Sequence, residues 1–395
     1  MSEVEFGSLF QFIRNGMNVR QDKSGEGLPI TRIETIAGAV VDASRVGYAG
    51  LEESDCREWL MQPGDILFSH INSVEHVGKC AVYQGVPEKL VHGMNLLCLR
   101  CDTAKLLPGF AKYLIRSPVF RARLASFINQ AVNQASVSIG NLKTIPVRLP
   151  SLAEQRRIAE VLDRAEALRA QRRLALVRLE ELAQAVFLED FGDPATNPRG
   201  WPVSPLAEVC SLAGEYGSGV PAKEHDPALP RYVRITDITE LGELSDEPAS
   251  PSGAATEWEG YLLEEGDILF ARSGATVGKT YLHRAVNGRC VFAGYLIRFR
   301  PNPQRLLPEF LFHFTRSVSY RAWVASRQRV VAQPNINATQ YGRELLLPLP
   351  PIALQQEFAR HISAVERLRA THRLSLRELD ALFATLQHRA FQGEL

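Results

Sequence analysis

The sequence contains few cysteines and no uninterrupted apolar stretch long enough to span a membrane. Its six cysteines are scattered over 395 residues, so we expect no disulfide framework. The longest apolar stretch, residues 345–354, is interrupted by three prolines and is too short to cross a bilayer. The first residues carry neither a basic start nor an apolar signal core, so we expect no export and a cytoplasmic location. A chain of this length typically forms two or three domains.

The chain also has almost no net charge. Lys and Arg number 45 and Asp and Glu 44, which gives a net charge of +1. This balance excludes a globally basic nucleic-acid binder but leaves room for a local basic face. Only eight of the 45 cations are lysines, so 37 are arginines. Either the coding sequence is rich in G and C, or the arginines serve guanine edges and phosphates, which they bind better than lysines do.

The sequence lacks the motifs of catalysis. The segment Gly274–Thr280 has three residues before its Gly-Lys pair, whereas a phosphate-binding loop needs four. Cys98 and Cys101 have metal-ligand spacing but no second Cys or His pair at a suitable distance. No lysine follows an acidic residue at the spacing of metal nucleases, and the serine-hydrolase, zinc-protease and amino-methyltransferase motifs are missing. We therefore predict no catalytic residue, no metal and no bound cofactor for this chain.

What the sequence does contain is an internal duplication. Residues 106–126 and 306–326 are identical at ten of 21 positions. Gly64-Asp-Ile-Leu-Phe68 recurs as Gly266-Asp-Ile-Leu-Phe270, and Val77-Gly-Lys79 recurs as Val277-Gly-Lys279. Two copies of a unit this long indicate two equivalent domains, at 1–150 and 204–350. Short apolar runs between turns predict strands in each domain, at 65–68 and 80–83 in the first, and two short helices follow near 108–130 and 308–328.

Each copy closes with Leu-Pro and a long helical segment. Apolar residues recur every third and fourth position, which predicts coiled-coil helices at 151–190 and 351–395 around an irregular linker, 191–203. The positions expected on the seam or against a partner are Ile158, Val161, Leu168, Leu179, Leu182, Phe358, Val365, Leu368, Leu379 and Leu382. The predicted fold is two tandem mixed α/β (α+β) domains joined by two long antiparallel helices with pseudo-two-fold symmetry. The alternative is two surface helices, each packed on its own domain.

Polar residues that recur in both copies are candidate DNA contacts. Asn and Gln amides match the adenine edge in the major groove, and Arg matches guanine. The candidates are Lys79, Arg116, Arg121, Asn133, Gln134, Arg272, Lys279, Arg316, Arg321, Gln333, Asn335 and Asn337. For the repeated arginines on the short helices, a solvated helix face or an internal salt bridge is an equally good interpretation.

In its order of parts, the sequence resembles the specificity subunits of type I restriction–modification systems. The resemblance is carried by the Gly-Asp-Ile-Leu-Phe and Val-Gly-Lys segments, the helix entries Leu149 to Gln155 and Leu349 to Gln355, the heptad helices, and the linker with Asn197-Pro-Arg-Gly-Trp201. It covers essentially the whole chain. One departure is visible, because the first copy lacks the Ser273-Gly274 turn and has two extra residues there.

The resemblance implies two target-recognition domains, each reading one half of a bipartite, asymmetric sequence in double-stranded DNA. It further implies that the helices set the spacer, which is the number of base pairs between the two half-sites. The helices would also dock two modification (methyltransferase) subunits, and restriction subunits would join this complex in phage defence. S-adenosylmethionine, ATP and Mg²⁺ are then expected on those partners, whose complex would methylate adenine and cleave DNA. A helix over 152–188 would be about 55 Å long, comparable with one or two turns of DNA. A stand-alone two-module DNA-binding regulator, a coiled-coil scaffold and an enzyme with an unrecognised site stay open.

Overall fold

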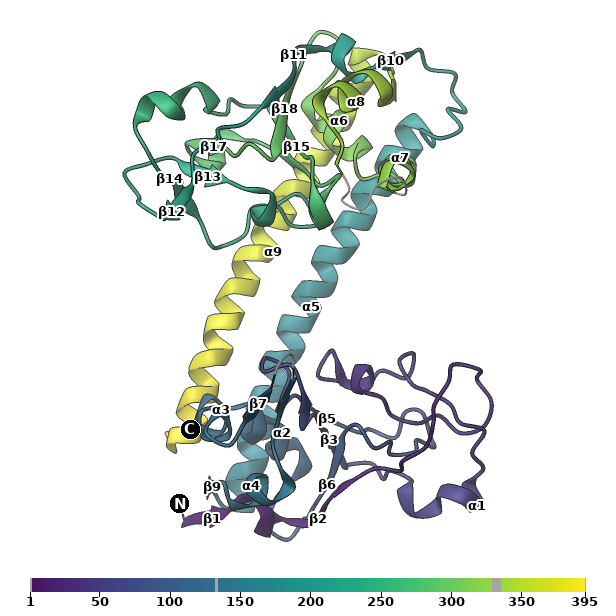
Figure 1. The fold of residues 1–395 in the computed structure, drawn as a ribbon, viewed down its shortest axis with the longest axis vertical. Helices are drawn as coiled ribbons and strands as arrows, with labels where there is room; N and C mark the ends of the chain where they lie inside the picture. Colours follow the sequence, from purple (N-terminus) through teal and green to yellow (C-terminus); the bar gives the residue numbers. More distant parts are fainter. Residues whose placement is uncertain (1, 132–133, 329–334, 395) are drawn as a thin grey trace. The chain divides into compact units, whose positions relative to one another are not determined.

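The computed structural model describes residues 2–131, 134–328 and 335–394. The chain divides into two compact units (Figure 1). Unit 1 comprises Met1–Arg173 and Leu374–Leu395, and unit 2 comprises Leu174–Arg373. Each unit therefore contains one domain together with part of both long helices.

A four-stranded antiparallel sheet forms the centre of unit 1. Its strand order is β2-β6-β3-β5, with β2 (Phe10–Asn15), β6 (Leu97–Cys101), β3 (Ile66–Phe68) and β5 (Cys80–Val82). Two smaller sheets accompany it: β1 (Ser2–Glu5) with β9 (Pro146–Leu149), and β4 (Ile71–Asn72) with β8 (Gln134–Ser136) and β7 (Asn129–Ala131). The apolar runs that predicted strands in this domain are β3 and β5, and all of β3 is buried because it is a central strand.

Unit 2 repeats the central sheet and the small sheet formed by the first and last strands of the domain, and its other small sheets differ. Its central sheet has the order β11-β18-β15-β16, with β11 (Cys210–Tyr216), β18 (Leu296–Pro301), β15 (Ile268–Ala271) and β16 (Thr280–Leu282). The smaller sheets pair β10 (Val203–Pro205) with β19 (Leu346–Pro348), β12 (Ala222–Glu224) with β14 (Ala249–Pro251), and β13 (Arg231–Val233) with β17 (Cys290–Phe292). The two Gly-Asp-Ile-Leu-Phe segments occupy the same central strand, so the duplication in sequence is a duplication of fold.

Short helices cover the sheets. Unit 1 has α1 (Glu53–Cys56), α2 (Pro108–Arg116), α3 (Pro118–Ala125) and α4 (Ile139–Thr144), and unit 2 has α6 (Pro308–Phe314), α7 (Val318–Gln328) and α8 (Ala338–Glu344). Helices α2 and α6 both begin at a proline, which fits the first turn because its missing N–H needs no partner there. The two short helices predicted in each copy are confirmed as α2–α3 and α6–α7.

The long helices are α5 (Leu152–Phe191) and α9 (Ile352–Gln392). Each is fixed to its own domain by a buried glutamine in the first turn. The Oε1 of Gln155 accepts from the backbone N–H of Leu107 (2.9 Å), and its Nε2 donates to the carbonyls of Lys105 (2.8 Å) and Pro150 (3.0 Å). Gln355 repeats all three bonds with Leu307 (2.8 Å), Arg305 (3.1 Å) and Pro350 (2.9 Å). We call these three hydrogen bonds of each glutamine the latch. The latch explains why Leu149 and Gln155, and likewise Leu349 and Gln355, are six residues apart.

The two helices run antiparallel in each unit, as predicted. In unit 2, Phe187 and Phe191 of α5 contact Phe358 of α9 at ring distances of 5.6 and 5.1 Å. Earlier on α5, Glu180 pairs with Arg369, which lies later on α9. In unit 1, Arg169 pairs with Asp380 and lies over the ring of Phe383.

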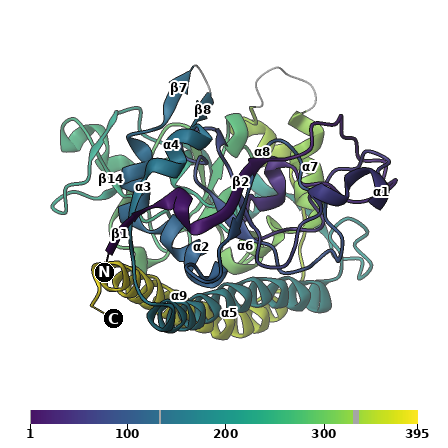
Figure 2. The same ribbon diagram turned by 90° about the horizontal axis from the view of Figure 1, so that it is seen from below.

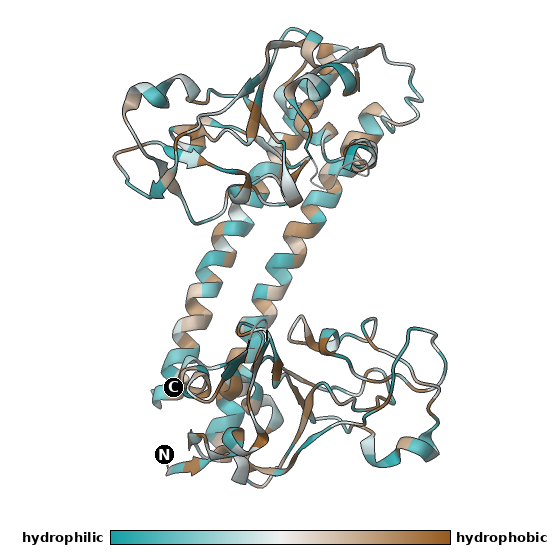
Figure 3. Cartoon of the chain, viewed as in Figure 1, coloured by the Kyte–Doolittle hydropathy of each residue, from teal (hydrophilic) through white to brown (hydrophobic). Residues whose placement is uncertain are grey.

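The predicted seam is partly wrong. Ile158, Phe358 and Val365 are buried, and Val161, Leu179 and Leu379 are partly buried, but four seam leucines are about half exposed: Leu168 (49%), Leu182 (47%), Leu368 (53%) and Leu382 (48%). The buried stripe instead runs through residues such as Leu162, Ala183, Phe187 and Ile362. The reason is that each helix packs against the core of its domain as well as against the other helix, which rotates its buried face. Figure 3 shows the resulting mixture of apolar and polar segments along α5 and α9.

Candidate nucleic-acid interface

Three candidate residues of the second domain meet beside the loop that follows β15. Arg272 lies with its guanidinium carbon 4.8 Å from the centre of the Tyr216 ring. Its Nε donates to Oδ1 of Asn335 over 3.4 Å, and Ser273 and Asn335 form an antiparallel bridge. The next candidate, Asn337, caps α8, where its side chain accepts from the N–H of Gln340.

The support under Arg272 is itself anchored. The hydroxyl of Tyr216 accepts a hydrogen bond from the backbone N–H of Ala338, in the first turn of α8 (3.0 Å). The backbone N–H of Arg272 donates to the carbonyl of Tyr295 (3.1 Å), and its carbonyl accepts from the N–H of Ile336 (2.9 Å). Tyr295 is 61% exposed, so an aromatic ring stands in solvent beside this group. We call Tyr216, Arg272, Tyr295 and Asn335 the arginine cluster.

The first domain presents a polar hairpin. Strands β7 and β8 form a hairpin that projects beyond α3 and α4 (Figure 2). Asn129, Gln130 and Gln134 are exposed on it. The hairpin is paired through β8 with β4, where Ile71 stands opposite Ser136. The candidates Asn133 and Gln333 lie outside the described residues.

Three of the four repeated arginines of the short helices are engaged inside the protein, which corrects their assignment as DNA contacts. Arg116 pairs with Glu166 of α5 (3.3 Å) and donates to the carbonyl of Cys80 (3.0 Å). Arg316 pairs with Glu180 of α5 (2.9 Å), and its side chain is only 9% exposed. Arg121 donates to the carbonyl of Val77. These side chains fasten the domains to α5 or brace a turn, and this is the alternative that the sequence left open.

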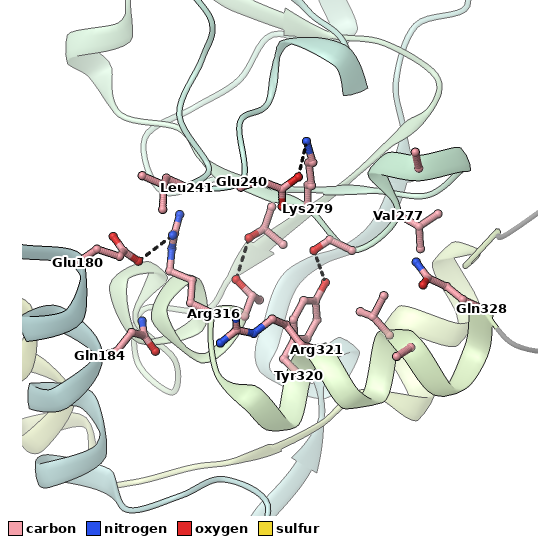
Figure 4. Close-up of a pocket in the computed structure, with 16 residues that line it drawn as sticks. Glu180, Gln184, Glu240, Leu241, Val277, Lys279, Arg316, Tyr320, Arg321 and Gln328 are labelled. Atoms are coloured by element: carbon pink, nitrogen blue, oxygen red, sulfur yellow. Dashed lines mark hydrogen bonds and ion pairs between the residues drawn. The ribbon is translucent and has the colours of Figure 1, made fainter. Parts of the chain in front are cut away.

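The two Val-Gly-Lys lysines reach to a neighbouring loop of their own domain. Lys79 donates to the carbonyl of Ala37 (3.4 Å), and Lys279 pairs with Glu240 (2.9 Å). Lys279 also lines a pocket of about 370 Å³ between α5, the Gly274–Gly278 turn and α7. Figure 4 shows Arg316, Arg321 and Gln184 on the side of this pocket nearest α5. Arg321 is exposed, unlike Arg121 in the first copy.

The scaffold under these surfaces depends on a buried aspartate in each Gly-Asp-Ile-Leu-Phe segment. Asp65 is 2% exposed and forms two hydrogen bonds with Arg100 (2.8 and 2.7 Å), which raise the pKa of Arg100. Asp267 is fully buried and binds Arg300 in the same way (2.7 and 3.0 Å). A buried carboxylate is tolerated because such a bidentate partner neutralises it. The segment is therefore part of the buried scaffold.

A family model for the type I restriction modification DNA specificity domain matches residues 1–177 and 198–379. The chain belongs to this family. A putative type I restriction enzyme MjaX specificity subunit of Methanocaldococcus jannaschii is 27% identical, with 92% of this chain and 86% of that protein covered. The type I restriction enzyme EcoKI specificity subunit of Escherichia coli K12 is 30% identical over 48% of this chain and 42% of that protein.

The family also accounts for the fold. A crystal structure of a type I restriction–modification system S subunit from M. genitalium has a TM-score of 0.58, with 13% identity over 99% of this chain and 96% of that one. Its resemblance extends over both domains and both long helices, so the duplicated architecture is that of the family.

Tyr216 and Tyr295 were missed by the sequence reasoning. Tyr216 lies in a glycine-rich segment, Gly214–Gly219, and Tyr295 follows Gly294. An aromatic residue among turn-forming glycines was the available signal, because such a residue cannot easily be buried there.

Within the described ranges, no group of three or more His, Cys, Asp or Glu side chains could hold a metal ion, and no helix is long and apolar enough to cross a membrane. Cys98 and Cys101 are both buried in β6, and burial raises the pKa of the Cys101 thiol to about 12. They are strand residues of the core, as their alternating context indicated.

Proposed function

We propose that this chain is the specificity subunit of a type I restriction–modification complex, in which each domain reads one half of a bipartite, asymmetric DNA target. The observation that carries the proposal is the pairing of identical scaffolds with different surfaces. The two central sheets share strand order, buried aspartate and helix latch, whereas one domain displays an amide-bearing hairpin and the other the arginine cluster. Two different readers on one repeated frame suit two unequal half-sites.

The long helices serve as the dock for two modification subunits, which restriction subunits join. The leucines displaced from the predicted seam support this role. Large apolar side chains about half exposed recur along both helices: Leu168, Leu174, Val177, Leu182 and Leu188 on α5, and Leu368, Leu374 and Leu382 on α9. A partner that covered these side chains would remove their apolar surface from water, which favours binding.

The subunit itself contributes recognition and no chemistry. S-adenosylmethionine, ATP and Mg²⁺ belong to the partners, and adenine is the base that they methylate. Helices of 40 and 41 residues, about 60 Å long at 1.5 Å per residue, join the two units and set the spacer between half-sites.

The test is to co-express the full chain with its modification subunits in cells that lack other methylation and to map methylated adenines across the DNA. A bipartite motif that requires this chain is expected. Replacement of residues 204–350 by the second domain of a relative should change one half-site and leave the other intact. Methylation that persists without the chain, or two half-sites that change together, would contradict the proposal.

A further inference from the structure

Arg272 differs from the three arginines that are paired inside the second domain. Arg298, Arg300 and Arg316 each pair with a carboxylate of the domain or of α5. Arg272 has no carboxylate partner among the described residues. Its Nε is bound to Asn335 and its plane rests near Tyr216, while the two terminal nitrogens of its fork have no partner in the described part of the chain.

The fork is held in place before any ligand arrives. Two backbone hydrogen bonds fix the main chain of Arg272, and the Tyr216 ring beneath it is fixed through the first turn of α8. A long side chain normally loses rotamer freedom on binding, and the contacts of the Arg272 side chain with Asn335 and Tyr216 lower that cost. Such orientation suits a ligand that needs two parallel hydrogen bonds in a set direction.

The duplication shows that this position carries a different residue in the first copy, between a strand and a Val-Gly-Lys turn that are both repeated, although the loop joining them is two residues longer there. His70 occupies the same place in the first copy, because its carbonyl accepts from the N–H of Val137 as that of Arg272 accepts from Ile336. Both positions lie between the repeated Ile-Leu-Phe strand and the repeated Val-Gly-Lys turn. His70 is 8% exposed, and its buried Nδ1 has no hydrogen-bond partner among the described residues. The first copy therefore buries the side chain at this position, whereas the second copy leaves its arginine partly exposed, so only the second domain presents a candidate reader here.

We propose that Arg272 reads a guanine in the half-site of the second domain, with its terminal nitrogens on O6 and N7 in the major groove. Tyr216 and Asn335 are positioning residues for this contact. The inference rests on the proposed function and deepens it. An arginine fork can bind either guanine or a phosphate with two hydrogen bonds, and guanine is favoured here because only one copy carries the arginine, as expected of a base contact that differs between half-sites.

The experiment uses the full chain in complex with its modification subunits and a library of duplexes in which each base pair of the target is varied. Arg272→Ala should lose discrimination at one G·C pair of the second half-site by roughly 10- to 100-fold, with the first half-site unchanged. Arg272→Lys keeps the charge but cannot bind bidentately, so it should lose most of the same preference. Arg289→Ala removes one exposed arginine from the same domain and should leave the motif unchanged.

Positioning is tested by Tyr216→Ala and Asn335→Ala, which should reduce discrimination at that same pair while other positions keep theirs. Arg272→Ala could instead weaken binding equally on all sequences and reduce, by about one, the slope of the logarithm of the affinity against the logarithm of the salt concentration. Arg272 would then contact a phosphate, and the inference would be wrong. An unchanged motif overturns it as well. In both cases the wild-type complex still yields a bipartite motif, so the proposed function survives. A wild-type complex without such a motif would remove both.

Discussion

Replacing Gln355 with leucine should weaken unit 2 far more than its size suggests. The side chain is fully buried and forms three hydrogen bonds, to the N–H of Leu307 and to two carbonyls. Leucine fills a similar volume but leaves one donor and two acceptors without partners. Each unsatisfied buried group costs about 1–3 kcal/mol, and part of that cost is offset by apolar burial, so we expect the free energy of unfolding to fall by about 3–5 kcal/mol.

The measurement is urea unfolding of the full chain and of three variants. Gln356→Leu is the matched control, because the neighbouring glutamine is exposed, and its effect should stay within about 0.5 kcal/mol. Gln155→Leu should produce a similar loss in unit 1, since its three hydrogen bonds are the same. A loss below about 1 kcal/mol for both latch variants would refute the reasoning, because the three bonds would then carry no net stability.

Three further predictions concern the helices and one buried histidine. Seven residues inserted both between 170 and 171 and between 370 and 371 lengthen each helix by about 10 Å. The spacer between the half-sites of the methylated motif should therefore grow by roughly three base pairs. An active variant that methylates the original motif would show that the helices do not set the spacer length. Leu168→Glu combined with Leu182→Glu should abolish co-purification with modification subunits and leave the circular dichroism spectrum intact, whereas retained binding would place the dock elsewhere. Burial lowers the pKa of His313 from 6.5 to about 3, so the unfolded state binds the extra proton and stability should fall as pH decreases from about 6.5 toward 3. His313→Gln should flatten that part of the stability curve, and an unchanged slope would assign it to other groups.

The sequence was sufficient where a feature repeats along the chain. The doubled Gly-Asp-Ile-Leu-Phe strands, the proline-started helices and the long helical segments each depend on local pattern, and the structure contains them. The seam failed because heptad spacing describes two helices alone, whereas Phe187 and Phe191 also pack on Phe310 of the domain. Arg316 was misassigned because its partner Glu180 is 136 residues away, and Tyr216 was missed because its contact with Arg272 joins distant segments. Side-chain partners of this kind follow from the tertiary fold and leave no local pattern.

The division of the long helices between the units bears on the origin of the chain. Unit 1 is built from the first domain, the first part of α5 and residues 374–395, which include the last part of α9. In the duplication, residues 374–395 are the counterpart of the last part of α5. A half-length protein ending near Phe191 would therefore contain each kind of segment that such a unit needs. Its own last helical segment would extend away from its domain, so a second molecule would have to supply the antiparallel one. Two identical molecules would exchange these segments and form a dimer with a palindromic target. Fusion of two such molecules, followed by divergence of one reading surface, yields the asymmetric target proposed for the present chain.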